Sequence, residues 1–224
     1  MKITIFNGSP RGGKSNTHVL TEAFREGAES AGAEVENFFL IDKKINHCRG
    51  CFSCWYKTPG KCVYNDDMTE LLEAWKNSDI VCYATPVYSW DLTACLKNFV
   101  DRLIPLKSPS VVEEEGNYDM RNTMKKNPDV VIISNAGFPG ENNFRTIRTV
   151  MSAANPILEI YRNCGMLLRS PGEGIIEKVE EYLAFIRRAG AALAIGAPLS
   201  DEVREGLEME LLPVNDYLAY ISGR

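Results

Sequence analysis

Short apolar runs rich in β-branched residues alternate along the chain with longer stretches in which apolar residues recur every three or four positions. The runs predict buried strands at residues 2–6, 34–41, 79–88, 129–137 and 165–170. The stretches that follow them predict helices at 15–31, from 67 onward, 92–103, 143–163, 178–195 and 200–212. Asp67 and Glu70 have the spacing of a capping box, and Pro156 is expected to break or kink its helix.

This alternation predicts an α/β fold, because successive parallel strands need a helical crossover that covers one face of the sheet. We expect a flavodoxin-like, doubly wound five-stranded parallel sheet with three α/β/α layers, formed as a single domain over residues 1–224. Sheets of this type bind ligands at the carboxyl ends of their strands. The segments expected at that edge are 8–17, 85–91 and 135–142.

Charge and composition narrow the function classes. The chain of 224 residues has a formal net charge of −5, which argues against a nucleic-acid surface. Its apolar runs are shorter than the roughly 18 residues of a spanning helix, and the N-terminal run is too short for a signal peptide. We therefore expect a cytoplasmic protein with no membrane partner. Two segments interrupt the alternation, a Cys-rich loop at 46–66 and a charged stretch at 107–128, which we expect to be a solvated excursion or an oligomer contact.

The first predicted turn contains a Gly-rich loop. Residues 8–15, GSPRGGKS, fit the P-loop pattern G-x-x-x-x-G-K-[ST] letter by letter. A P-loop NTPase also needs a carboxylate for Mg²⁺ at the end of another strand, and the predicted strand ends CYATP and IISNAG carry none. The loop is better explained as a neutral nest of backbone N–H groups at a helix N-terminus, which suits one terminal phosphate without a metal. Further donors come from Ser9, Ser15, Asn16 and Thr17. The alternative is that these side chains only cap the helix.

Two segments together resemble the NAD(P)H-dependent FMN reductases of flavodoxin-like fold, namely the loop GSPRGGKSNT and the segment ATPVYSWDLTACLKNFVDRL at 84–103. The resemblance implies bound FMN. It places at the phosphate Ser9, Arg11, Ser15, Asn16 and Thr17. Beside the flavin ring, the resemblance places Pro86, Val87, Tyr88 and Ser89. A third wall of the FMN site is expected from Asn135, Ala136 and Gly137.

The Cys-rich loop carries a second pattern. Its cysteines, Cys48, Cys51, Cys54 and Cys62, form a C-x2-C-x2-C-x7-C array. Two consecutive x2 spacings are closer to iron–sulfur ligation than to the separated knuckles of structural zinc. The array resembles the compact cysteine motif of the iron–sulfur flavoproteins, a branch of the same fold, and this resemblance implies a [4Fe–4S] cluster. Packing or redox thiols and a zinc site are the alternatives.

The other potential ligands have simpler interpretations. Cys82 is expected in a strand, and Cys95 and Cys164 are expected in helices, each as a small buried hydrophobe. His18 is expected near the Gly-rich loop as a polar helix residue, and His47 is expected to be solvated.

The sequence therefore predicts an FMN-binding redox flavoprotein, linked to NAD(P)H or a ferredoxin-like protein, with the cluster passing single electrons. No catalytic side chain is assigned, because the cofactor carries the chemistry. One alternative is a cluster-free NAD(P)H oxidoreductase that reduces a quinone, a flavin or a nitro compound. Two more distant ones are a P-loop nucleotide-binding protein and a zinc-stabilised binding module. The resemblance also implies a homodimer or homotetramer.

Overall fold

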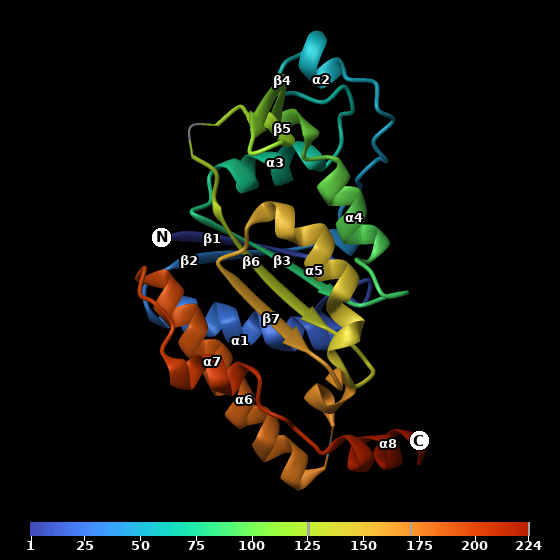
Figure 1. Cartoon of the computed structure of the whole chain (residues 1–224), viewed down its shortest axis with the longest axis vertical. Coiled ribbons are helices and arrows are strands. Elements are labelled where there is room, and N and C mark those ends of the chain that lie inside the picture. The colour runs from blue at the N-terminus through green and yellow to red at the C-terminus, as the bar shows by residue number, and fades with distance from the viewer. Residues whose placement is uncertain (125, 171, 224) are drawn as a thin grey trace.

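The computed structural model describes residues 1–124, 126–170 and 172–223, which form one large and one small sheet (Figure 1). The strands of the large sheet are β1 (Lys2–Asn7), β2 (Glu34–Phe39), β3 (Ile80–Pro86), β6 (Asp129–Asn135) and β7 (Leu158–Arg162). They are parallel throughout and lie in the order β2-β1-β3-β6-β7. This is the flavodoxin order once the two strands of the small sheet are set aside, so the predicted fold class is confirmed.

Helices cover both faces of this sheet. Those in the described part of the chain are α1 (Asn16–Ser30), α2 (Ser53–Tyr56), α3 (Met68–Lys76), α4 (Ala94–Asp101), α5 (Arg145–Met151), α6 (Glu173–Ala194), α7 (Asp201–Leu207) and α8 (Val214–Ser222). Helices α1 and α6 pack on one face, whereas α3, α4 and α5 cover the other (Figure 1). The three predicted layers are therefore present.

The two faces form separate cores because successive strand residues point to opposite sides. In β1, Ile5 packs in one core with Phe24 of α1. The next residue, Phe6, enters the other core, where its ring stacks on Phe99 of α4 with the ring centroids 4.4 Å apart. One strand thus anchors helices on both sides of the sheet.

Two glycines bring α1 and α6 into backbone contact. A Cβ atom at Gly27 would lie 1.9 Å from the carbonyl oxygen of Arg187. A Cβ atom at Gly190 would lie 2.3 Å from the carbonyl oxygen of Phe24. Neither position can accept a side chain without separating the helices, which explains why glycines interrupt otherwise good helical sequences.

The fifth strand does not lie where the sequence predicted it. The edge strand is β7, which pairs with β6, and the prediction of a strand at 165–170 is wrong. Residues Gly165–Arg169 instead form a 3-10 helix. Cys164, expected in a helix, precedes it in a left-handed conformation with φ of 50°. Strand β7 was not predicted because its charged residues, Glu159 and Arg162, are three positions apart and so also fit a helical spacing.

The predicted helix over 143–163 is correspondingly too long. Helix α5 ends at Met151, and a short 3-10 turn follows it. Asn155 then takes a left-handed conformation with φ of 47°, immediately before Pro156. A residue before proline is driven away from the helical region, so the chain leaves the helix here rather than kinking within it.

Two further helix predictions are corrected, and the charged excursion has secondary structure of its own. The charged excursion contains an antiparallel hairpin of β4 (Lys107–Glu114) and β5 (Asn117–Asn122); residue 125 lies outside the described part. Asp67 does not cap α3 through its side chain, because its Oδ2 accepts from the Lys44 amide at 2.7 Å. The C-terminal helix predicted over 200–212 ends at Leu207, and α8 follows as a separate helix. Among the described residues, no helix is long and apolar enough to cross a bilayer.

Candidate functional site

The loop after β1 is fixed against its neighbours by close packing. The Gly8 amide donates to the carbonyl oxygen of Ala84 at 2.8 Å, and the Thr93 hydroxyl donates to the Gly8 carbonyl at 2.6 Å. A Cβ atom at Gly8 would lie 2.5 Å from the Cβ atom of Leu96. Only glycine fits between β3 and α4 here, so the first residue of the Gly-rich motif sets the position of the whole loop.

Ser15 begins α1 as its N-cap. Its hydroxyl donates to the Gly12 carbonyl at 2.7 Å and accepts from the His18 amide at 3.0 Å. The first-turn amides of Asn16 and Thr17 have no intrahelical acceptor, because none exists at a helix start. These amides and the helix dipole give this corner a positive potential that suits a phosphate.

The predicted phosphate-binding residues differ in how they lie. Ser9, Ser15 and Thr17 are buried, whereas Arg11 is exposed. The Thr17 hydroxyl donates to Asn135 Oδ1 at 2.6 Å. That bond joins the Gly-rich loop to the end of β6, so two of the three predicted walls meet in the structure.

The second wall is a tight turn after β3. The Val87 amide donates to the Asn135 carbonyl at 2.8 Å, which aligns the ends of β3 and β6. Tyr88 and Asp91 exchange backbone hydrogen bonds of 3.1 and 3.0 Å. Ser89 and Trp90 between them have φ values of 48° and 62°, an arrangement that turns their side chains outward.

Exposed aromatic rings surround this edge. Tyr88 is 49% exposed and Trp90 is 61% exposed, while Phe138 beyond the third wall is 66% exposed. Trp90 and Phe138 were not predicted as site residues, although both neighbour predicted ones in sequence. Flat apolar rings at a strand edge provide the kind of contact that an aromatic ligand needs.

The third wall receives support from the C-terminal helix. Ala136 is buried, and the adjacent Gly137 carbonyl accepts a hydrogen bond from the Tyr217 hydroxyl of α8. This contact spans 80 residues of sequence. It had no signal in the sequence, since α8 itself was not predicted as a helix.

Arg169 is a second residue that sequence reasoning missed. Its guanidinium donates from Nη2 to the carbonyls of Gly13 at 3.3 Å and Ser15 at 3.2 Å. Carbonyls and amides of a tight loop point in opposite directions, so a cation on the carbonyl side leaves the amide side open. The assignment of 165–170 to a strand hid this role.

The corner has the chemistry of a phosphate monoester site. It combines helix-start amides with the Nδ2 atom of Asn7, which is buried with no partner among the described residues. The hydroxyls of Ser15 and Thr17 already donate to Gly12 and Asn135 and so help to fix the loop. The strand ends beside it, at Pro86 and Asn135, present no acidic side chain for a metal ion. The donor set therefore fits the phosphate of FMN.

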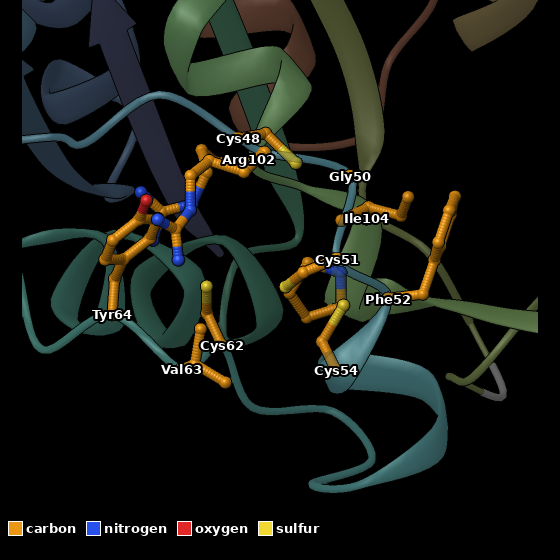
Figure 2. A pocket seen from close by; sticks show the side chains of 12 residues that line it. Cys48, Gly50, Cys51, Phe52, Cys54, Cys62, Val63, Tyr64, Arg102 and Ile104 are labelled. Carbon is orange, nitrogen blue, oxygen red and sulfur yellow. The ribbon is translucent and has the colours of Figure 1, made fainter.

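The second candidate site is the cysteine pocket, a hollow lined by all four cysteines of the array together with Arg49, Tyr64 and Arg102 (Figure 2). All four are free thiols, and only Cys54, on α2, is buried. Figure 2 shows the sulfur atoms of Cys51, Cys54 and Cys62 turned toward the middle of the pocket. Residues spread over 15 positions of sequence thus share one hollow, as the spacing of the array predicts.

The thiols of this pocket are electrostatically unequal. Hydrogen bonding to Ser53 lowers the pKa of Cys51, whereas burial and the neighbouring Cys62 thiol raise the pKa of Cys54. In the part of the chain that the structure describes, no group of three or more His, Cys, Asp or Glu side chains is arranged to hold a single metal ion. Four thiols around one hollow nevertheless match the donor set of an iron–sulfur cluster.

An ion pair fixes Arg102, one of the residues that line the cysteine pocket. Arg102 donates to the two carboxylate oxygens of Asp66 at 2.9 and 3.0 Å, and its side chain is 1% exposed. Burial alone would raise the pKa of Asp66, but hydrogen bonds from Arg102 and Asn46 outweigh it and lower that pKa to about 2. The loop carrying the cysteines is therefore anchored to the end of α4 by a fixed pair of charges.

The three cysteines outside the array and the two histidines follow their predictions in part. Cys82 and Cys164 are buried as expected, whereas Cys95 on α4 is half-buried. His18 stands beside the Gly-rich loop, with its ring edge-on to Phe39 at 5.1 Å between centroids. His47 is exposed and contacts Asn98, with its Nδ1 3.1 Å from the amide oxygen.

Known proteins resemble the chain in sequence and in fold. An iron–sulfur flavoprotein of Archaeoglobus fulgidus is 43% identical over 105 residues, which cover 47% of this chain and 46% of that protein. The chain thus spans about half the length of the curated relatives that it matches.

Two solved structures share the fold. An NAD(P)H:quinone oxidoreductase from Methanothermobacter marburgensis has a TM-score of 0.62 at 21% identity, covering 86% of this chain and 96% of that one. An FMN-dependent NADH-azoreductase from Bacillus anthracis, solved with FMN, has a TM-score of 0.63 at 16% identity, covering 86% and 99%.

A family model that matches more than half of the chain identifies its family. The family model described as NADPH-dependent FMN reductase matches residues 1–134. This range includes the Gly-rich loop, the turn after β3, the cysteine pocket and the strand β6 up to its penultimate residue. The chain therefore belongs to the NADPH-dependent FMN reductase family.

Proposed function

We propose that this protein is an FMN-dependent electron-transfer flavoprotein that carries a [4Fe–4S] cluster in the cysteine pocket. The observation that carries the proposal is the gathering of four free thiols in one hollow, on a chain whose family binds FMN. FMN supplies two-electron chemistry that can be divided into single-electron steps, and a cluster passes electrons singly.

The proposed FMN site lies at the carboxyl edge of β1, β3 and β6. The corner before α1 would hold the phosphate through the amides of Asn16 and Thr17, with Arg169 keeping the loop in shape. The residues proposed to contact FMN are Ser9, Arg11, Ser15, Asn16, Thr17, Pro86, Val87, Tyr88, Ser89, Asn135, Ala136 and Gly137. The exposed rings of Tyr88 and Trp90 would exclude water from one side of the flavin.

Helix α4 links this site to the cysteine pocket. Thr93 at its start bonds the Gly-rich loop, and Arg102 at its end lines the pocket. The eight residues of α4 lie between them, which makes nine steps along the helix, or about 14 Å at the usual rise. The proposed ligands are Cys48, Cys51, Cys54 and Cys62, and the proposed electron partners are NAD(P)H, a quinone or a ferredoxin-like protein.

A second candidate function is a cluster-free NAD(P)H oxidoreductase that reduces a quinone, a flavin or a nitro compound. The observation that favours it is the burial of the Cys54 thiol. Its side chain is 7% exposed, and burial raises its pKa. A thiol of that kind is also typical of simple packing. In this case the cysteines would stabilise the loop, and only the flavin would react.

One preparation separates the two functions. Protein purified without oxygen should contain one FMN and four iron and four sulfide per chain, with flavin and iron–sulfur absorption together. Cys48→Ser should keep FMN and lose iron, whereas Cys95→Ser, outside the pocket on α4, should keep both. A wild-type protein with full FMN and NAD(P)H oxidation but no iron would favour the cluster-free oxidoreductase. Colourless protein that does not bind FMN would contradict both.

A further inference from the structure

Arg102 carries a buried charge, and its hydrogen bonds to Asp66 and Asn46 are made by its Nη atoms alone. It caps the C-terminal end of α4 and is 1% exposed. Charged side chains are almost never buried to this extent unless they are paired. Asp66 and the carbonyl of Asn46 accept from its Nη atoms. These contacts use both Nη atoms of the guanidinium.

The third nitrogen of the guanidinium, Nε, takes no part in these contacts. The Nε atom of Arg102 is buried and has no hydrogen-bond partner among the described residues. Arg102 lines the pocket with the four cysteines, and its guanidinium stands 5.2 Å from the centre of the Tyr64 ring. The guanidinium of Arg49 lies 5.4 Å from the centre of the same ring. Two positively charged side chains therefore lie near Tyr64 at the edge of the cysteine pocket.

Cys62 is the sulfur that interacts with this guanidinium. Burial opposes the charge of Arg102, but hydrogen bonding to Asp66 and the presence of Cys62 outweigh it, so the pKa of Arg102 is raised. An N–H group buried without an acceptor is costly, and a sulfur acceptor bound in the pocket would remove that cost. The pocket therefore brings together the unpartnered Nε–H of Arg102 and the sulfur of Cys62, a donor and an acceptor of compatible chemistry.

We infer that Arg102 is a positioning residue that donates from Nε to the sulfur of Cys62 or to a sulfur of the group bound there, and so raises the reduction potential of that group. This inference rests on the proposed function. A cluster held by four thiolates is negatively charged and becomes more so on reduction. A hydrogen bond and a fixed positive charge at its sulfur atoms favour the reduced form.

Two substitutions distinguish this role from simple support of the fold. Arg102→Gln removes a positive charge that lines the pocket and leaves Asp66 behind, so the potential should fall. Asp66→Asn removes the negative charge and leaves Arg102, so the potential should rise. Both variants break the same ion pair, so a merely structural role would move the two potentials in the same direction.

The experiment is a spectroscopic redox titration of the cluster in oxygen-free protein, with iron and sulfide counted in each variant. Arg102→Gln should weaken one-electron reduction at least tenfold, which is about 59 mV, and Asp66→Asn should strengthen it by a smaller factor. Lys97→Gln is the matched control, since it removes an exposed charge from the same helix and should leave the potential unchanged.

Each outcome decides the inference. Shifts of opposite sign support it, whereas shifts of the same sign or no shift in either variant overturn it alone. If Arg102→Gln fails to fold, the Asp66→Asn shift decides, and anything but a rise overturns the inference. Wild-type protein that contains FMN but no iron and sulfide would overturn the proposed cluster and this inference with it.

Discussion

The phosphate corner and the cysteine pocket are built in opposite ways. The corner lies at the ends of regular strands, where Gly8 packs against Leu96 and Thr17 bonds Asn135. The cysteine pocket lies in a loop with one short helix, α2, at the end of the molecule that also holds the hairpin of β4 and β5 (Figure 1). One site is fixed by the sheet itself, whereas the other depends on a loop and a single ion pair.

The two sites differ in what keeps them rigid: packed backbone holds the phosphate corner, whereas the cysteine pocket depends on side chains and on its proposed ligand. A corner shaped by packed backbone keeps its form without a ligand, because the strands that carry it are among the most buried parts of the protein. A loop with three of its four cysteines at least partly exposed needs its ligand, or Asp66 and Arg102, to hold the sulfur atoms together. Changes in one site should therefore spare the other, and the predictions below test that independence.

The largest expected effect follows from breaking the ion pair. Asp66→Ala leaves the Arg102 guanidinium buried without its carboxylate, which should lower the free energy of unfolding by about 3–5 kcal/mol. Urea unfolding of the cluster-free protein measures this. FMN content of the folded fraction should stay at the wild-type value, because the corner does not depend on Asp66. The exposed carboxylate variant Glu73→Ala should change stability by less than about 1 kcal/mol; equal losses in the two variants would contradict the structural role of the pair.

The converse change should damage the corner and spare the pocket. Gly8→Ala forces a methyl group to within 2.5 Å of Leu96 Cβ, so either the loop or α4 must move. The expected cost in the free energy of unfolding is about 1–3 kcal/mol, and FMN affinity should fall together with it. Gly174→Ala is the control, because a Cβ atom there meets no heavy atom within 4 Å. Retention of iron with loss of FMN in Gly8→Ala would support the independence of the two sites, and loss of both would break it.

The sequence predicted the corner better than the pocket, for a physical reason. A buried strand, a glycine loop and a helix follow one another without interruption, so local pattern alone brings Gly8, Ser15 and Thr17 to one sheet edge. The cysteine spacing likewise predicted a shared hollow. The ion pair beside the pocket could not be predicted in the same way, because Asp66 and Arg102 are 36 residues apart and only tertiary packing pairs them.

The edge strand shows the same limit. Strand β7 is five residues long, and its charged residues also fit a helix, so the local pattern could not separate the two structures. Pairing with β6 decided the outcome. Arg169 was lost with that error, since a residue assigned to a strand could not be placed against the Gly-rich loop.

The loss of unfolding free energy at low pH should depend on Asp66, beside the cysteine pocket. The pKa of Asp66 is lowered from 3.8 to about 2 in the folded protein. Its contribution is therefore fully present above about pH 4 and is lost as the pH falls toward 2, amounting to about 2 kcal/mol over that window. Unfolding free energy measured across this range should fall more steeply in the wild type than in Asp66→Asn. Parallel acid limbs in the two proteins would show that Asp66 does not carry this dependence.

The smallest expected effect is that of removing a helix cap, and it tests whether Ser15 also contributes to FMN binding. Ser15→Ala removes the N-cap of α1 and should cost about 1 kcal/mol in the free energy of unfolding. Ser200 caps α7 in the same way, accepting from the Val203 amide at 3.3 Å, so Ser200→Ala should cost a similar amount. The two variants share the lost cap but differ in position, because α7 lies away from the carboxyl edges of β1 and β3, and in the further bond that Ser15 donates to Gly12. FMN dissociation measured by flavin fluorescence should therefore weaken in Ser15→Ala and stay unchanged in Ser200→Ala. Equal FMN affinity in the two variants would mean that the Ser15 hydroxyl serves its own helix alone and that the phosphate is held by backbone amides.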